Sequence, residues 1–378
     1  MRVTCYSSLA ELLPLREAWT TVHSESSQKS PFTSFEFVEL WYRHFLGDNS
    51  ARVYAVEDHA QPIGFLPLVC THRGPFRVLK SLTNDHCAHS GPVIRRGHED
   101  GFLRAILGHL SGHPHSWDQF VYAFTYSFSD LPGLFPQTLL SSSRLAWHQE
   151  IEPSYAVVLN VPFDDYVRNT LSPATRKHYK RYSRRLAQSR PTFRHYQHSA
   201  AIDHWQEFLA MEDSGWKNQA RSSIRQLSAN YQEYYAGLLD LLARRESLHL
   251  YFLDIGDTPA ASALGYTEGD IFHWAKVAYD ESLGEYSPSN MLTFHIIQDL
   301  VAHSPEIARF HMFPWDYGYK HRYANEDAQH ISTVLFSSGP RGRIIRGLSH
   351  LKQTASRIAH YTPIQRLVRN RRLPFASR

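Results

Sequence analysis

Residues 273–300 read "HWAKVAYDESLGEYSPSNMLTFHIIQDL". The stretch begins with aromatic and β-branched residues typical of a strand, passes a loop marked by Gly and Pro, and ends in a helix-like pattern. Ser287 has the side chain of an N-cap, and Pro288 suits the first helical position, where a missing N–H costs nothing. The apolar residues that follow recur at helical spacing: Leu292, Ile296, Ile297, Leu300 and Val301. The stretch therefore predicts a strand, a loop and a helix.

The predicted helix has an open N-terminus that favours an anion. Its first backbone N–H groups and the positive end of its dipole attract negative charge, and Ser287, Ser289 and Asn290 add donors. A pyrophosphate would fit there, although Ser-Pro also serves as an ordinary helix cap. The sequence contains no GxGxxG or GxxxxGK[ST] motif at this point, which disfavours a dinucleotide or P-loop nucleotide site. The remaining class of protein that places an anion in a loop after an antiparallel strand is one that transfers groups from coenzyme A.

Composition indicates a globular protein. The 378 residues are 42% hydrophobic and 13% aromatic, enough for two domains or for one domain made of two halves. No apolar run approaches the ~20 residues of a membrane span, and the N-terminus lacks a signal-peptide hydrophobic region, so we expect a cytoplasmic protein. Cys5, Cys70 and Cys87 are too few and too scattered for a disulfide framework.

The two halves of the chain share an order of elements. Each is expected to contain helices, a three-strand antiparallel meander, a helix and another strand, and "VYAVEDHAQPIGFLPLV" (53–69) resembles "LYFLDIGDTPAASALGY" (250–266). A duplicated α/β architecture follows, with mixed sheets and helices on their faces. We expect one half at 1–152, a second half carrying the donor site at 153–340, and a basic tail at 341–378.

Two segments lack acidic residues. The tail, 341–378, holds ten Lys or Arg between apolar residues, a pattern typical of a basic amphipathic helix. Such a helix suits an anionic membrane surface, packing against the body, or nucleic acid. The second segment, 166–202, contains "ATRKHYKRYSRRLAQSR", which could bind nucleic acid or form a solvated helix face.

Four ordered blocks resemble a known family. They are "TRKHYKRYSRRL" (175–186), "EDSGWK" (212–217), "YDESLGEYSPSNML" (279–292) and "WDYGYKHRY" (315–323). Together with "PFTSFEFVELWYRHF" (31–45) they resemble GNAT-like acyltransferases of the CelD/BcsL type, over roughly residues 30–340. Two positions depart from the family pattern, because Asn290 and Trp315 stand where Gly is usual.

The resemblance implies a tandem duplicated GNAT fold, related to the FemAB-type transferases. It implies an acyl-thioester donor, coenzyme A or an acyl carrier protein, an amine acceptor, and no metal. For the basic helix it adds a third option, a position near the donor or an anionic acceptor. Acyl transfer to an amine needs a neutral amine, a polarised carbonyl and a protonated leaving thiolate, so a general base near pKa 7 would serve. Asp316 is our candidate base, unless it only caps a helix. His273 is a second candidate, unless it is a satisfied buried histidine.

The remaining candidates are expected around the donor and the acceptor. Lys320 would hold donor phosphates or an acidic acceptor, and Tyr319 or Tyr323 would protonate the leaving sulfur. Strand alternation places Lys276 with Trp274, opposite His273, where it would face the cleft. The donor would be held by Ser287, Pro288, Ser289, Asn290 and Lys276. The acceptor would be held by Asp85, His86, Trp216, Lys217 and Tyr319. Each of these residues also has an ordinary packing or surface role as its alternative.

The run "NDHCAH" (84–89) contains metal-ligand residue types, but its spacing matches no standard site. We therefore expect Asp85 and His86 to reach into the cleft between the halves. The leading hypothesis is an N-acyltransferase that acts on a lipid of sphingoid type or a glycan precursor of the cell envelope. Membrane-peripheral binding through the tail fits the lipid option. The alternatives are a FemAB-like transferase that uses aminoacyl-tRNA and a non-catalytic, membrane-associated component of a polysaccharide pathway.

Overall fold

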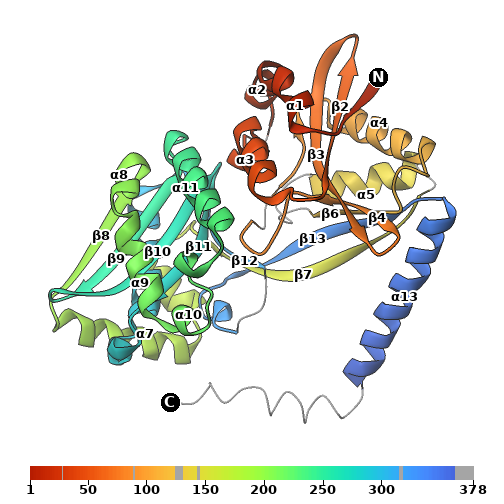
Figure 1. Cartoon of the computed structure of the whole chain (residues 1–378). Coiled ribbons are helices and arrows are strands. Elements are labelled where there is room, and N and C mark those ends of the chain that lie inside the picture. Colours follow the sequence, from red (N-terminus) through yellow and green to blue (C-terminus); the bar gives the residue numbers. More distant parts are fainter. Residues whose placement is uncertain (28, 88–89, 124–130, 143–144, 315–317, 362–378) are drawn as a thin grey trace.

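The computed structural model describes residues 1–27, 29–87, 90–123, 131–142, 145–314 and 318–361. Within these ranges, thirteen strands form a single mixed sheet in the order β1-β2-β3-β4-β6-β13-β7-β12-β11-β10-β9-β8, with β5 paired to β3. Figure 1 shows this sheet passing from the N-terminal to the C-terminal half, with helices on its faces. The expected α/β architecture with a mixed sheet is confirmed.

The two halves of the sheet repeat one topology. In the first, β1 to β4 form an antiparallel meander and β4 pairs in parallel with β6. In the second, β8 to β11 form the same meander and β11 pairs in parallel with β12. The first set of strands is β1 (Arg2–Tyr6), β2 (Ser50–Asp58), β3 (Gln61–Arg73), β4 (Phe76–Ser81), β5 (Val93–Ile94) and β6 (Gln119–Ala123). The second is β8 (Pro191–Gln197), β9 (Leu248–Ile255), β10 (Thr258–Glu268), β11 (Ile271–Tyr279) and β12 (Arg309–Pro314).

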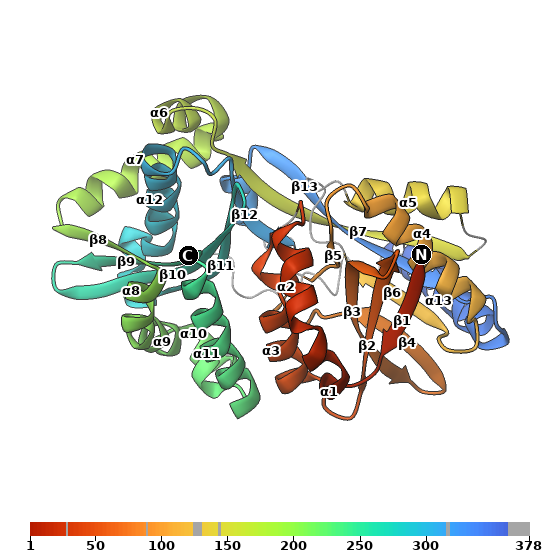
Figure 2. The same cartoon turned by 90° about the horizontal axis from the view of Figure 1, so that it is seen from above.

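Two long strands exchange places between the halves. The strand β7 (Ala146–Val158) follows β6 in the chain but pairs with β12. Conversely, β13 (Glu326–Phe336) follows β12 but pairs with β6. The two exchanged strands pair with each other at the centre of the sheet, as Figure 2 shows. The expected boundary at residue 152 lies inside β7, so each half completes its sheet with a strand from the other.

Helices cover both faces. On one face α2 (Arg16–Ser24), α3 (Phe35–Phe45), α9 (Trp205–Ser214) and α11 (Ala229–Arg244) contribute to one apolar core that spans both halves. On the other face, the N-terminal half carries α4 (Glu99–Gly112) and α5 (Leu131–Ser142). There the C-terminal half carries α6 (Phe163–Asp165), α7 (Pro173–Ala187) and α12 (Pro288–His303). The shorter α1 (Leu9–Leu12), α8 (His198–Asp203) and α10 (Trp216–Gln219) complete the set, with the C-terminal α13 (Pro340–Tyr361).

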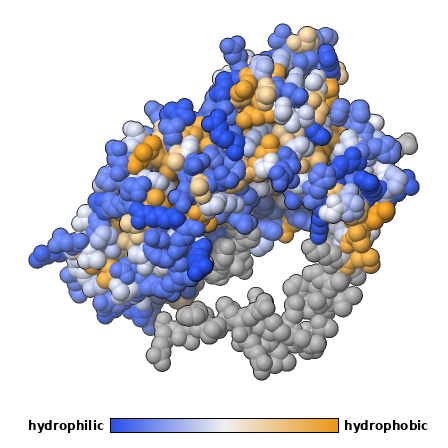
Figure 3. All heavy atoms as spheres, viewed as in Figure 1, coloured by the Kyte–Doolittle hydropathy of each residue, from blue (hydrophilic) through white to orange (hydrophobic). Residues whose placement is uncertain are grey.

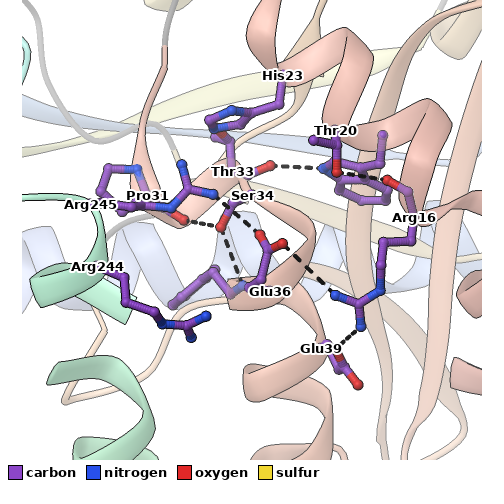
Figure 4. A network of polar contacts seen from close by, with 12 residues as sticks. Arg16, Thr20, His23, Pro31, Thr33, Ser34, Glu36, Glu39, Arg244 and Arg245 are labelled. Atoms are coloured by element: carbon purple, nitrogen blue, oxygen red, sulfur yellow. Dashed lines mark hydrogen bonds and ion pairs between the residues drawn. The ribbon is translucent and has the colours of Figure 1, made fainter. Parts of the chain in front are cut away.

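The halves are also joined by an ion pair between α3 and the residue that follows α11. Arg245 donates to Glu36 at 3.2 Å, and Arg16 lies 3.8 Å from the other oxygen of the same carboxylate. Figure 4 shows Glu36 between these two arginines, with Arg16 also reaching Glu39. The helices α11 and α3 pack side by side, so the contact joins the C-terminal half to the N-terminal half.

The prediction that Lys276 and Trp274 share one face of β11 was wrong. The pairing of β10 with β11 shifts register between Leu264 and Gly265, which marks a β-bulge. Trp274 packs in the core on the α12 face, whereas the Lys276 ammonium contacts Glu212 on α9, across the sheet. The extra residue of the bulge turns Lys276 to the opposite face from Trp274.

Candidate functional site

A cavity of about 630 Å³ opens where β11 and β12 diverge. The two strands pair only from Ile271/Arg309 to His273/His311, and the residues that follow line the cavity. Lining residues come from both cores: Leu264 belongs to the core on the α11 face, and Met312 to the core on the α12 face. The cavity therefore passes through the sheet from one face to the other.

At one end, which we call the donor end, the cavity meets the first turn of α12. The helix begins at Pro288, as the sequence predicts, but Ser287 adopts a left-handed conformation (φ 52°, ψ 53°). Its hydroxyl accepts a hydrogen bond from Asn290 Nδ2 at 2.7 Å instead of capping the helix. The first backbone hydrogen bond of the helix joins Met291 N–H to Ser287 O at 3.0 Å. The N–H groups of Ser289 and Asn290 come before this bond, so they have no acceptor within the helix. Ser289 and Asn290 both line the cavity.

Tyr323 fixes the side chain of Asn290. The Tyr323 hydroxyl donates to Asn290 Oδ1, and the phenol ring packs against Phe294 of α12 at 5.1 Å between centroids. Burial raises the pKa of Tyr323 well above its ordinary value, so the hydroxyl keeps its proton. Asn290 thus bonds through both ends of its amide, an arrangement that glycine at this position cannot make.

The basic helix α7 lies beside the donor end. Arg185 donates to the backbone oxygen of Glu285, in the loop before α12, at 3.1 Å. The apolar face of α7 packs through Tyr179 on Phe294 at 4.8 Å, which leaves the basic side chains partly or fully exposed. Of the three interpretations of this helix, the position next to α12 favours contact with an anionic substrate.

Two lysines meet on one buried carboxylate beside the cavity. Glu212 Oε1 accepts from Lys217 Nζ at 2.8 Å and lies 3.4 Å from Lys276 Nζ, while Ile224 N–H donates to its Oε2 at 2.9 Å. The Glu212 side chain is 0% exposed. Burial alone would raise the pKa of Glu212, but the two ammonium groups outweigh it and hold that pKa below its ordinary value. Burial lowers the pKa of Lys276, and Glu212 only partly offsets this.

The N-terminal half contributes to the same cavity. Asp85 and His86 line it from the loop after β4, and the His86 Nδ1 atom lies 2.9 Å from the Tyr235 hydroxyl of α11. Burial, followed by the nearby Lys276 charge, lowers the pKa of His86, which favours the neutral imidazole at pH 7. Asp85 and His86 therefore lie in the space between the halves.

The cavity brings together most of the residues singled out from the sequence. Those that line it are Asp85, His86, Lys217, Lys276, Ser289, Asn290, Tyr319, Lys320 and Tyr323. Lys320 is almost fully buried and donates to the backbone oxygens of Phe313 and Pro314, both at 2.9 Å. That bonding gives Lys320 a structural role at the bulge of β12.

Other candidates lie elsewhere. Ser287 and Pro288 shape the start of α12 without lining the cavity, and His273 is fully buried 3.3 Å from His311, ring nitrogen to ring nitrogen. Asp316 lies outside the described residues, and Trp216 is described only as the first residue of α10. None of the described residues form a group of three or more His, Cys, Asp or Glu arranged to hold a metal ion.

Sequence reasoning missed part of the lining. Glu212 belongs to the block "EDSGWK", but nothing in the sequence marks it as the counter-ion of Lys276, 64 positions away. Leu238, Leu239 and Leu242 of α11 also line the cavity. Their helical spacing was visible in "YYAGLLDLL" and predicts only a buried face.

Residues 173–321 match the family model of the acetyltransferase (GNAT) domain. The matched range begins at α7 and includes Glu212, Lys276 and the first turn of α12. No curated protein matches the chain with significant similarity.

Solved structures resemble the chain over nearly its whole length. FemX aligns with 91% of this chain and 100% of its own, at a TM-score of 0.56 and 10% identity. A C-terminal domain assigned to a lysylphosphatidylglycerol synthetase from Agrobacterium fabrum aligns with 91% of this chain and 97% of its own, at 0.53 and 12%. A conserved protein of unknown function from Bacteroides thetaiotaomicron aligns with 86% and 97%, at 0.53 and 13%. At such identities the likeness concerns the fold alone. The GNAT match lies in the second half, and the first half repeats the strand topology of the second.

Proposed function

We propose that the protein is an N-acyltransferase that moves an acyl group from a coenzyme A thioester, or from an acyl carrier protein, to an amine. The observation that carries the proposal is the cavity that runs from the first turn of α12 through the gap between β11 and β12. The family match over residues 173–321 supports the same chemistry. Within this proposal, the blocks at 212–217, 279–292 and 315–323 assign the chain to the CelD/BcsL type.

The donor would lie with its phosphates at the α12 N-terminus. The N–H groups of Ser289 and Asn290 and the helix dipole favour negative charge there, and the basic side chains of α7 lie alongside. The gap between β11 and β12 would take the extended arm of the donor, which places its thioester near Lys276. The residues present therefore fit the group.

The transfer itself follows from the groups around Lys276. The neutral amine attacks the thioester carbonyl carbon, the C–S bond breaks, and the leaving thiolate takes a proton. Lys276 would stabilise the oxyanion, since it lines the cavity and Glu212 fixes its ammonium group. Asp316 remains our candidate for the base that takes the proton of the amine. Of the two candidate donors of the proton to sulfur we retain Tyr319, because the Tyr323 hydroxyl donates to Asn290 and its raised pKa keeps its proton in place.

The direct test is release of free thiol from acyl-coenzyme A in the presence of pooled amines. Wild-type protein should release thiol only when an amine is present. Asp316→Asn should cut turnover by about 10²–10⁴-fold, the usual contribution of a general base, without changing the thermal unfolding midpoint. If neither coenzyme A binding nor thiol release is detected with any acyl-coenzyme A, the proposal fails.

We propose a lipid or a glycan precursor of the cell envelope as the amine acceptor, and an anionic membrane as the place of action. The first turns of α13 dock on the sheet through Ile345, which packs with Val334 and Phe336. Beyond that contact α13 extends from the body (Figure 1), and its exposed Ile344, Leu348 and Leu351 lie on one face. Hydrophobic surface is visible on these turns in Figure 3.

Away from this apolar stripe α13 carries Arg346 on the opposite side and Arg343 at the flank, a pattern typical of a helix that lies on an anionic surface. No helix of the described residues is both long enough and apolar enough to cross a membrane. Co-sedimentation with vesicles containing phosphatidylglycerol should therefore be lost in Leu348→Glu. Ser349→Glu adds the same charge away from the apolar stripe and should retain most of the binding. Equal loss in both variants would contradict the apolar contact.

A further inference from the structure

The end of the cavity opposite to the donor end has a different chemistry. Five apolar side chains, each less than 10% exposed, line it on the α11 face of the sheet, and we call this part the leucine end: Phe32, Leu238, Leu239, Leu242 and Leu264. Phe32 comes from the N-terminal half and packs against Tyr266 of β10, with 5.0 Å between the ring centroids and the rings tilted by 52°. The leucine end is thus closed jointly by the two halves.

Polar groups also line the cavity. Lys276 and Lys217 are held on Glu212, and the Lys276 ammonium lies 5.4 Å from the ring centre of Tyr235, whose hydroxyl holds His86. We call this connected group the polar belt. A sugar or an amino acid placed at the leucine end would bring hydroxyl or charged groups against leucine side chains. Each such group without a partner costs about 1–3 kcal/mol. The lining therefore disfavours a polar occupant.

We propose that the leucine end binds a linear hydrocarbon chain carried by one of the two substrates. The inference rests on the proposed function for the position of the reacting carbonyl, which would lie at the polar belt beside Lys276. From there the chain extends toward Leu239 and Leu242, away from the first turn of α12. One of the two substrates is then a fatty acyl donor or a long-chain amine. An acetyl donor together with a small polar amine would leave the leucine end unused.

Burial of methylene groups sets the size of the expected effect. Each methylene that leaves water contributes about 0.8 kcal/mol, and about 1.4 kcal/mol is a factor of ten, so affinity rises about fourfold for each fully buried methylene. Calorimetric titration of the full chain with coenzyme A, acetyl-, octanoyl- and dodecanoyl-coenzyme A, below micelle formation, measures this rise. We expect octanoyl-coenzyme A to bind at least a hundredfold more tightly than acetyl-coenzyme A.

Leu239→Phe tests the place of the chain. The larger ring fills the leucine end and should weaken octanoyl-coenzyme A at least tenfold, with coenzyme A itself unchanged within twofold. Leu239→Met conserves the volume and should keep the wild-type chain-length dependence. The titrations of the wild-type protein test the inference by themselves, so it can be contradicted even if a variant does not fold.

A second arm uses dodecylamine and butylamine in place of the thioesters. If only the amines show the chain-length effect and its loss in Leu239→Phe, the chain belongs to the acceptor and the inference holds. If coenzyme A binds but neither series depends on chain length, the inference is overturned and the proposed function stands. If dodecylamine binds at the leucine end while no coenzyme A derivative binds at all, the inference holds and the proposed function fails.

Discussion

The two halves differ in the first turn of one helix. After the parallel-paired meander strand of each half comes a crossover helix, α4 in the first half and α12 in the second. The first turn of α4 carries Glu99 and Asp100, whereas the first turn of α12 carries Ser289, Asn290 and no acid. Carboxylates at a helix N-terminus neutralise the positive end of the dipole, so only α12 remains open to an anionic ligand.

The first half of the repeated fold has a packed interior where the second half has a cavity. In the first half, Phe102 of α4 fills the space at Gly64, where an added Cβ would lie 2.6 Å from the ring. In the second half β11 and β12, the counterparts of β4 and β6, border a cavity. The first half instead supplies Phe32, Asp85 and His86 to that cavity. One half is thus proposed to bind the donor, and the other to complete the walls.

The largest expected effect concerns the buried charges of the second half. Glu212→Gln leaves Lys276 and Lys217 in a buried site without their counter-ion, which should lower the free energy of unfolding by about 3–5 kcal/mol. Glu36→Gln, at the one-third exposed ion pair between α3 and α11, is the matched control and should cost about 0–1 kcal/mol. Urea denaturation measures both, and equal losses would contradict the difference in burial.

The second prediction makes the first turn of α12 resemble that of α4. Asn290→Asp keeps the acceptor for Tyr323 but places a carboxylate beside the N–H groups proposed for the donor phosphates. Coenzyme A affinity should fall about tenfold to a hundredfold, about 1.4–2.8 kcal/mol, with little change in stability. Asn290→Gly, the residue usual in the resembling family, should keep measurable affinity. Undiminished binding by the Asp variant would place the phosphates elsewhere.

The third prediction is a pH dependence that arises in the second half. His249 on β9 is buried next to His195 (3.0 Å between Nε2 of His195 and Nδ1 of His249), and burial lowers its pKa to about 3. The unfolded chain takes up this proton below about pH 6.5, and the folded chain does not, so stability falls as pH decreases from 6.5 toward 3. Between pH 7 and pH 5 the loss from this group is about 2 kcal/mol.

The equivalent strand β2 buries Ala51, Val53 and Val56, which do not titrate. His249→Phe should therefore reduce the difference between the unfolding free energies measured at pH 7 and pH 5, whatever its effect at pH 7 alone. An unchanged difference would mean that the acid sensitivity arises from other groups.

The smallest effect is expected in the first half. The double substitution Glu99→Gln and Asp100→Asn removes the acids of α4, together with the 2.7 Å ion pair between Asp100 and Arg104. Stability should decrease by about 0.3–1 kcal/mol, the usual contribution of an exposed acid at a helix N-terminus. Coenzyme A affinity should stay within twofold of the wild-type value. A marked change would assign the first half a part in donor binding.

Local patterns in the sequence predicted much of the fold. The strand at 271–279 and the helix that begins at Pro288 follow from β-branched residues and from the Ser-Pro pair, and both are confirmed. The strand β8, Pro191–Gln197, was missed because its basic and aromatic residues, mostly half-buried, show no clear alternation. The exchange of β7 and β13 depends on pairings far apart in sequence, which no local pattern contains.

The candidate site was predicted as a set of residues and not as a geometry. A block that resembles a family named Asn290, and strand alternation named Lys276. The bulge at Ala275, opposite Leu264 and Gly265, decides which face Lys276 occupies. The leucine end is made by residues of α11 and by Phe32, which are about 200 positions apart. A helical apolar stripe looks the same whether it faces a packed core or a cavity, so this feature needed the tertiary structure.

The central claim is that one half of the duplicated fold, the second, binds the acyl donor. Calorimetric titration of the full chain with coenzyme A tests it through the stoichiometry. We predict one coenzyme A per chain, with that binding weakened at least tenfold by Asn290→Asp and unchanged by the double substitution at Glu99 and Asp100. Two molecules per chain, or one that is insensitive to Asn290→Asp and lost on changing Glu99 and Asp100, would contradict the account.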